Sequence, residues 1–257
     1  MDFGVQIFGL RQEFNRDPQG VSHQLREAGL TFLEPRVMLR EEPQLRGAAW
    51  TPAEFARFVP MLREAGMGLY SCHVYTLDLL GDLLGLVELA QQYEICQYVI
   101  PCPAFSSREE YEAQARMLTQ AGKALQQVGV ELLLHNGQAE SAQTLDGVTV
   151  YAWLLRACQG AVGAQVDLGW LLAGGVDIPA FLGENRELIR SLHYKDMEQT
   201  PQGLQECAVG QGLLDIPVCS RFAFTQGCPQ VVDQNGSRGD FLQDVRYAAG
   251  LLTENEA

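Results

Sequence analysis

The chain is short of basic side chains, and this shortage excludes one large class of partners. Only 18 Lys and Arg residues stand against 32 Asp and Glu residues, which gives a net charge of −14 at pH 7. A surface of this sign repels phosphate backbones and offers no basic stripe, so we expect no nucleic-acid partner. The same acidity could concentrate divalent cations near an acidic rim.

Paired cysteines and long apolar runs are lacking as well. The seven cysteines are dispersed, and none of them forms a C-x-x-C pair. This pattern indicates neither a disulfide framework nor a zinc finger, and it favours a reducing compartment. No apolar run has the length of a membrane span, and Met1-Asp2-Phe3-Gly4 enters a strand-like run instead of a signal peptide. We therefore expect a cytoplasmic protein without a membrane partner.

What the sequence does contain is a regular alternation of short apolar runs with amphipathic stretches. The chain has 257 residues, 47% of them hydrophobic, and can bury a sizeable core. The runs predict eight buried strands: Phe3 to Phe8, Thr31 to Arg36, Met67 to His73, Ile95 to Pro101, Gly129 to His135, Ala161 to Asp167, Leu188 to Tyr194 and Gln230 to Asp233. The stretches between them predict five helices: Val21 to Glu27, Pro52 to Ala65, Leu79 to Gln92, Ser107 to Val128 and Asp240 to Leu252.

This alternation predicts the fold class. Strands separated by helices form parallel sheets with right-handed crossovers, and eight such units in a chain of this length match a (β/α)8 barrel. A doubly wound open sheet would give a similar pattern. That fold would carry a glycine-rich phosphate loop after its first strand, where this chain has Phe8-Gly9-Leu10-Arg11. We predict an α/β protein, a (β/α)8 TIM barrel, with residues 1–257 forming a single domain.

Polar residues end most of the predicted strands. In a barrel of this kind the active site is built at the C-terminal ends of the strands. Three of the four histidines occupy such ends, together with several acidic and amide residues: Glu34 and Arg36, His73, His135 with Asn136 and the nearby Glu140, Asp167, His193 with Lys195, and Asp233 with Gln234. Carboxylates and imidazoles from separate strands form a mixed oxygen and nitrogen site, which suits Mn, Mg, Co or Zn.

Four short motifs follow the last four predicted strands. They are Leu134-His135-Asn136-Gly137-Gln138-Ala139-Glu140, Val166-Asp167-Leu168-Gly169-Trp170, His193-Tyr194-Lys195-Asp196 with a later Gly210-Gln211-Gly212, and Val231-Val232-Asp233-Gln234-Asn235. In this order they resemble the motifs His-Asn-His-x-x-Glu, Asp-x-Gly-His, His-x-Lys-Asp with Gly-x-Gly, and Val-Glu-x-Asp. These belong to the xylose isomerase-like barrel family of sugar (phosphate) isomerases and epimerases, whose relatives include inosose dehydratases and endonuclease IV. The resemblance covers nearly the whole chain.

The resemblance implies a set of site residues. The metal ligands would be Glu140, Asp167, His193 and Asp233, with His135 as the alternative to Glu140, because some relatives place a carboxylate at its position. Glu140 and Asp233 would be the catalytic acid/base pair. Substrate contacts would come from His73, His135, Lys195, Trp170 and Glu34. The chain departs from the family at three positions, where Asp233 replaces a glutamate and Gly137 and Trp170 each replace a histidine.

The function implied is a divalent-metal-dependent isomerase or epimerase of a sugar or keto-sugar. It would work by proton transfer through a metal-stabilised enediolate. One alternative is an inosose dehydratase-like lyase, which would share the enediolate and expel a hydroxyl group. The other is a barrel that binds a sugar without turnover, suggested by the three departures. The expected partner is a small-molecule carbohydrate, self-association into a homo-oligomer is left open, and the acidic charge argues against a DNA-repair role.

Overall fold

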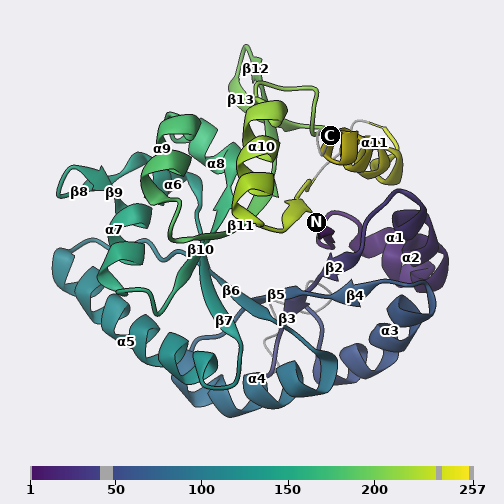
Figure 1. The fold of residues 1–257 in the computed structure, drawn as a ribbon, viewed down its shortest axis with the longest axis horizontal. Helices are drawn as coiled ribbons and strands as arrows, with labels where there is room; N and C mark the ends of the chain where they lie inside the picture. Colours follow the sequence, from purple (N-terminus) through teal and green to yellow (C-terminus); the bar gives the residue numbers. More distant parts are fainter. Residues whose placement is uncertain (1, 41–48, 236–238, 255–257) are drawn as a thin grey trace.

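The computed structural model describes residues 2–40, 49–235 and 239–254, and a closed parallel sheet lies at its centre (Figure 1). Ten strands follow one another in the order β3-β5-β6-β7-β10-β11-β14-β1-β2-β4. The strands β2 (Phe32–Glu34) and β3 (Arg36–Val37) are two halves of one strand, interrupted at Pro35, which has no N–H to donate. The strands β4 (Gly68–Leu69) and β5 (Ser71–Val74) are likewise halves of the next strand.

These interruptions account for the barrel. Because β2 pairs with β4 while β3 pairs with β5, the two ends of the ten-strand order meet and the sheet closes. When β2 with β3 and β4 with β5 are each counted as one strand, the ten segments occupy eight positions around the barrel, as predicted. The other six are β1 (Phe3–Gln6), β6 (Gln97–Pro101), β7 (Glu131–His135), β10 (Gly163–Asp167), β11 (Ile189–Tyr194) and β14 (Gln230–Val232). The α/β TIM-barrel prediction is confirmed.

Five predicted helices are also present, with ends shifted by a few residues. They are α2 (Pro18–Glu27), α3 (Pro52–Glu64), α4 (Leu79–Tyr93), α5 (Arg108–Gln126) and α11 (Phe241–Glu254). The start of α3 was readable because Thr51 and Glu54 form a capping box, in which each side chain accepts the backbone N–H of the other. No helix in the described part of the chain is both long and apolar enough to cross a membrane.

Six helices were not predicted from the sequence. They are α1 (Arg11–Arg16), α6 (Gln138–Ala142), α7 (Val150–Ala157), α8 (Leu168–Ala173), α9 (Ile178–Asn185) and α10 (Ile216–Gln226). Three of them, α1, α6 and α8, have at most 6 residues, and α7 and α9 have 8 each, which is too short for a helical period to stand out from the sequence. The 11-residue α10 was missed as well. Both α6 and α8 directly follow strands at the C-terminal rim, so they shape the site.

An antiparallel hairpin of β12 (Asp196–Thr200) and β13 (Gly203–Cys207) projects beyond the barrel (Figure 1). The fully buried carboxylate of Asp196 holds its base by accepting four backbone N–H groups, from Met197, Gly210 and Gly212 at 2.9 Å and from Leu214 at 3.0 Å. The Asp196 of the His-Tyr-Lys-Asp motif and the Gly-x-Gly turn therefore form one structural anchor. A smaller hairpin joins β8 (Thr144–Leu145) to β9 (Val148–Thr149).

Candidate functional site

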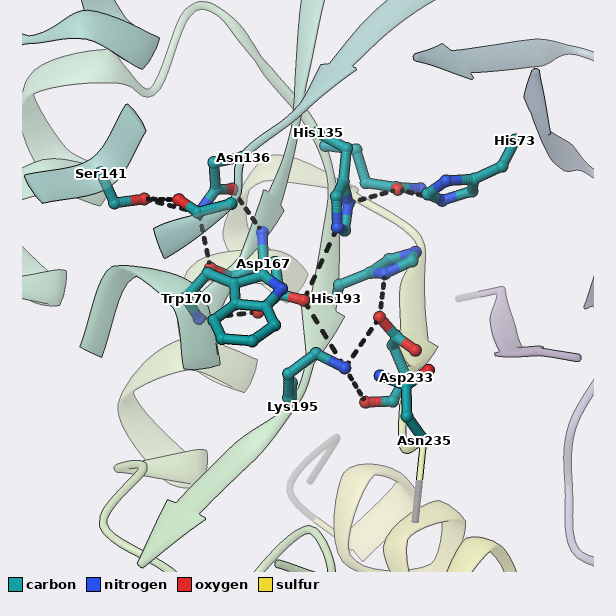
Figure 2. A network of polar contacts seen from close by, with 12 residues as sticks. His73, His135, Asn136, Ser141, Asp167, Trp170, His193, Lys195, Asp233 and Asn235 are labelled. Carbon is teal, nitrogen blue, oxygen red and sulfur yellow. Dashed lines mark hydrogen bonds and ion pairs between the residues drawn. The ribbon is translucent and has the colours of Figure 1, made fainter. Parts of the chain in front are cut away.

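Four side chains converge at the C-terminal ends of four neighbouring strands (Figure 2). His135 ends β7, Asp167 ends β10, His193 lies near the end of β11, and Asp233 directly follows β14. One ligand atom from each of them lies within 4.8 Å of the others. Three of the four predicted metal ligands are therefore together, and the fourth place is taken by His135, which the sequence offered as the alternative to Glu140.

Glu140 lies outside this cluster. It is in the first turn of α6, where its Oε2 accepts the backbone N–H of Gly137 at 3.1 Å. This contact holds the carboxylate at the start of the helix, away from the ligand atoms of the cluster, although Glu140 still lines the adjacent pocket. The spacing of these residues after the strand could not show whether His135 or Glu140 points toward the cluster.

Asp167 is fixed by contacts on both sides of its backbone. Asn136 accepts the Asp167 N–H at 2.8 Å and donates to the Asp167 carbonyl oxygen at 3.0 Å. The side-chain Oδ1 caps α8 by accepting the N–H of Trp170 at 2.9 Å, and Oδ2 remains on the cluster side, 3.7 Å from His135 Nε2. Burial, together with repulsion from Asp233, raises the pKa of Asp167 to about 7. A buried carboxylate in this state gains from a cationic ligand.

Glu34, predicted to contact substrate, is instead fully buried behind the cluster and does not line the pocket. Its Oε1 lies 2.9 Å from His73 Nε2 and 2.8 Å from His193 Nε2. Burial opposes ionisation of Glu34, but the charge of His193 and the contact with His73 outweigh it and lower the pKa well below its usual value. Glu34 thus supports two histidines of the site from behind.

A second buried polar residue, Gln165, sets the protonation of His135. Its Nε2 donates to the ionised Glu34 at 2.9 Å, which forces its Oε1 toward His73 Nε2 at 2.9 Å and His135 Nδ1 at 3.0 Å. Because that oxygen can only accept, His135 must carry its proton on Nδ1. Its Nε2 then presents a lone pair to the cluster, as in metal-ligating histidines oriented by an outer hydrogen bond. Burial, reinforced by His193 and His73, lowers the pKa of His135 well below its usual value, which keeps the ring neutral.

His193 and Lys195 carry the positive charge of the site. Each ring nitrogen of His193 faces a carboxylate: Nε2 faces Glu34, and Nδ1 lies 3.3 Å from Asp233 Oδ2. Burial disfavours its charge, but the two carboxylates outweigh burial and raise the pKa of His193 to about 10. Lys195, which is almost fully buried, places Nζ 3.1 Å from Asp233 Oδ2. Burial likewise opposes the Lys195 charge, but Asp233 and Asp167 outweigh it and raise the pKa.

Three buried atoms of this network have no hydrogen-bond partner within the described residues: Glu34 Oε1, Asp167 Oδ2 and His193 Nε2. The 2.8 Å approach of His193 Nε2 to Glu34 Oε1 is a charge contact in which the ring N–H does not point at the oxygen. Buried polar atoms are rarely left unpartnered, and an ion is one explanation for such a group. The donor set of two imidazoles and two carboxylates fits a divalent cation, which on binding would displace the proton from one nitrogen of His193, because a ligating imidazole must be neutral.

A cavity of about 260 Å³ opens beside the cluster. Of the predicted substrate contacts, His73, His135 and Trp170 line it, while Lys195 lies beneath Trp170 with Nζ 5.8 Å from the ring centre. The opening is close to the small end of the range for ligand pockets, so it suits a small molecule. The other lining residues are Gln6, Arg36, Tyr75, Pro101, Cys102, Asn136, Gly137, Glu140, Asp233 and Asn235.

Sequence reasoning missed three residues of this site. Gln165 lies two residues before Asp167 and Tyr75 two residues after His73, so strand alternation could have placed both on the inner face. Glu206, in the hairpin strand β13, reaches Lys195 Nζ at 3.7 Å and gave no sequence signal, because the hairpin itself was not predicted.

No family model matches the chain, and no curated protein matches it significantly in sequence. Solved structures do match in shape. A sugar phosphate isomerase/epimerase from Parabacteroides distasonis superimposes with a TM-score of 0.75 at 17% identity, covering 100% of this chain and 94% of the other. A probable 3-DHS dehydratase from Bacillus anthracis gives 0.75 at 13% identity, with coverage of 98% and 99%.

A third match binds a metal. A xylose isomerase-like TIM barrel protein from Mycobacterium smegmatis, in complex with magnesium, gives a TM-score of 0.67 at 16% identity, with coverage of 93% of this chain and 89% of the other. At these identities the matches establish the fold. The chain has the fold of the xylose isomerase-like TIM barrel proteins, as its sequence motifs predicted.

Proposed function

We propose that this protein is a divalent-metal-dependent isomerase or epimerase of a small sugar or keto-sugar. The single observation that carries the proposal is the cluster of His135, Asp167, His193 and Asp233, whose ligand atoms lie within 4.8 Å of one another beside a small pocket. The fold shared with a sugar phosphate isomerase/epimerase supports it. Mn, Mg, Co and Zn all remain candidates for the ion, and we propose that residues 1–257 act as one domain.

These four residues would hold the ion, with Glu34 and Gln165 orienting the histidines from behind. When bound, the ion would act as a Lewis acid on a substrate carbonyl and so acidify the adjacent C–H bond. The protein supplies the rest of the site through groups fixed before substrate arrives. His73 and Trp170 line the pocket beside the cluster, where they can contact the bound sugar.

Asp233 and Glu140 are the groups we propose for proton transfer. Both line the pocket, and they follow β14 and β7, which are separated in the sheet by β10 and β11. Each has one oxygen held by the protein: Asp233 Oδ2 by Lys195 at 3.1 Å, and Glu140 Oε2 by the Gly137 N–H at 3.1 Å. The other oxygen of each can take or return a proton at a substrate carbon. Two such groups on different walls suit an epimerisation, in which the proton leaves one face and returns to the other.

A dehydratase reaction is the second candidate, favoured by the equal likeness of the fold to a probable 3-DHS dehydratase. It would begin with the same proton removal and then expel a hydroxyl group at the neighbouring carbon. The two reactions can be separated by incubating candidate keto-sugars in deuterated water. A product that contains deuterium and has lost no water supports the isomerase or epimerase, and a product that has lost water supports the lyase.

The first experiment is the metal content of protein purified without chelator or added metal. We expect about one divalent ion per chain, the stoichiometry of a single four-ligand site. His135→Ala and Asp167→Ala should lose the ion, and Glu140→Gln should keep it, because Glu140 lies outside the cluster. A wild-type protein that binds no ion even after incubation with Mn or Zn would contradict the proposal. Loss of the ion in Glu140→Gln but not in His135→Ala would contradict the ligand assignment.

A further inference from the structure

A positively charged side chain in the wall of the pocket has no role in the chemistry above. Arg36 lines the cavity, and its Nε is buried without a hydrogen-bond partner in the described part of the chain. Among the described residues, no carboxylate lies within ion-pairing distance of it. The Arg36 side chain as a whole is half-buried, but a buried N–H without an acceptor costs free energy, and a ligand oxygen in the pocket could supply that acceptor.

The strand pattern explains where Arg36 points. Glu34 faces the inside of the barrel, and Arg36 lies two residues further toward the C-terminal rim, on the same face. Arg36 pairs in register with His73 on the neighbouring strand. Tyr75 lies two residues beyond His73. The polar layer that supports the metal cluster is therefore followed, one step closer to solvent, by a layer that contains Arg36 and Tyr75.

Aromatic rings orient the guanidinium. Its central carbon lies 3.6 Å from the ring centre of Phe8 and 5.2 Å from that of Tyr75. Arg11 lies 4.2 Å from the same Phe8 ring, so a second positive charge is close by. Stacking fixes the plane of a guanidinium and leaves its N–H edge available, which is the edge that binds carboxylate or phosphate oxygens in pairs.

Several charges act on Arg36. Burial lowers its pKa, Arg11 lowers it further, and Tyr75, Asp233 and Glu34 raise it. A guanidinium stays protonated in proteins, so Arg36 keeps an incompletely compensated positive charge in the pocket wall. It is the one Lys or Arg side chain among the described residues that line this cavity.

We propose that Arg36 binds an anionic oxygen group of the substrate, so that the substrate is a sugar acid or a sugar phosphate and not a neutral sugar. This inference rests on the proposed function in taking the pocket as the substrate site. The anionic end would lie against Arg36, and the carbonyl end would lie toward His135 and Asp233. Chemically, the substrate would then come from a reaction class that oxidises a sugar to its acid or phosphorylates it.

The test compares three probes of similar size and different charge: sorbitol, gluconate and sorbitol 6-phosphate. Calorimetric titrations on wild-type protein, both Mn-loaded and metal-free, should show tighter binding of at least one anionic probe than of sorbitol. Using both forms separates Arg36 from chelation of the ion by gluconate. Whichever anion binds more tightly identifies the group as carboxylate or phosphate.

Arg36→Gln should weaken binding of the preferred anion by about tenfold or more and leave sorbitol unchanged, as expected for a lost charge-assisted contact. Arg36→Lys, which keeps the charge, should retain part of the preference. The control is Arg57→Gln, because Arg57 stacks on Phe58 at 5.0 Å in α3 and does not line the pocket. Its affinities should match those of the wild type.

Two results would overturn the proposal: equal wild-type affinity for the neutral and anionic probes, or a preference that survives in Arg36→Gln. If Arg36→Gln does not fold, Arg36→Met carries the test, and a wild-type preference for the anionic probe in Arg36→Met would overturn the proposal. Metal content is measured on every variant. Anion selectivity that depends on Arg36 in a protein without metal would leave this inference standing while the proposed function fails.

Discussion

Replacing Asp196 tests whether the His-Tyr-Lys-Asp motif is partly structural. The two carboxylate oxygens share four donors evenly: Oδ1 accepts from Met197 and Leu214, and Oδ2 accepts from Gly210 and Gly212. Asp196→Ala leaves all four N–H groups without this partner. Asp196→Asn keeps one oxygen but turns an amide N–H toward the other pair, so it should relieve little of the loss.

The magnitude follows from the burial of these donors. A buried N–H without a partner costs roughly 1–3 kcal/mol, and water can reach the two glycine N–H groups, which are only partly buried. We expect either substitution to lower the free energy of unfolding by roughly 4 kcal/mol or more, at the high end for single substitutions. Urea unfolding followed by circular dichroism measures this loss.

The matched control is Asp215→Ala. Asp215 is exposed and caps α10 through one contact, to the N–H of Val218 at 3.1 Å. Loss of such a cap typically costs about 1 kcal/mol. If Asp196→Ala were no more destabilising than Asp215→Ala, the anchoring role derived from the four contacts would be refuted.

Three further predictions concern other parts of the molecule. Gly122→Ala should destabilise the protein by about 1–3 kcal/mol, because a Cβ there would lie 2.0 Å from the Ala161 carbonyl oxygen. Gly183→Ala should stabilise it by about 0.5–1 kcal/mol, because Gly183 lies in α9 with open space around it. Thermal unfolding compares the two variants, and equal effects would contradict the packing argument. Of the seven cysteines only Cys96 is exposed, so a thiol reagent should label one cysteine of the native protein quickly. Partial burial and then nearby carboxylates raise the pKa of the Cys96 thiol, so its labelling rate should keep rising past a pH of about 8.5. Fast labelling of two or more cysteines would contradict this prediction. Glu34→Gln should weaken metal affinity about 10-fold to 100-fold by removing the carboxylate behind His193, with unchanged affinity as the contrary result in a competition titration.

The barrel could be predicted from the sequence because its strands are buried on both faces. Continuous apolar runs, such as Leu132 to Leu134, mark such strands without requiring an alternating pattern. The starts of the helices after Thr51 and Ser107 were also predictable, because the capping boxes there depend only on residues close in sequence. The hairpin of β12 and β13 could not be predicted, because Asp196 holds it through contacts up to 18 residues away.

The site was predicted to the extent that it depends on strand ends. Once the barrel was expected, Asp167, His193 and Asp233 had to lie on one rim, and the structure brings them together. The choice between His135 and Glu140 depends on the direction of two side chains, which is set by the Gly137 N–H and by Gln165. Neither contact is visible in the spacing of the motif.

A single buried carboxylate connects the layers of this site. Glu34 orients Gln165, which fixes the proton of His135, and it also lies against His193, so two candidate ligands depend on one residue that never reaches the pocket. Two residues further along the same strand, Arg36 does reach the pocket. Glu34 and Arg36 lie on the same face of the strand, because side chains alternate between the faces at every residue. The negative charge of Glu34 therefore lies behind the cluster, and the positive charge of Arg36 faces the pocket. An ion held by the first layer and an anionic group held by the second would fix a small substrate at two points, and this two-point contact would determine which carbon faces Asp233.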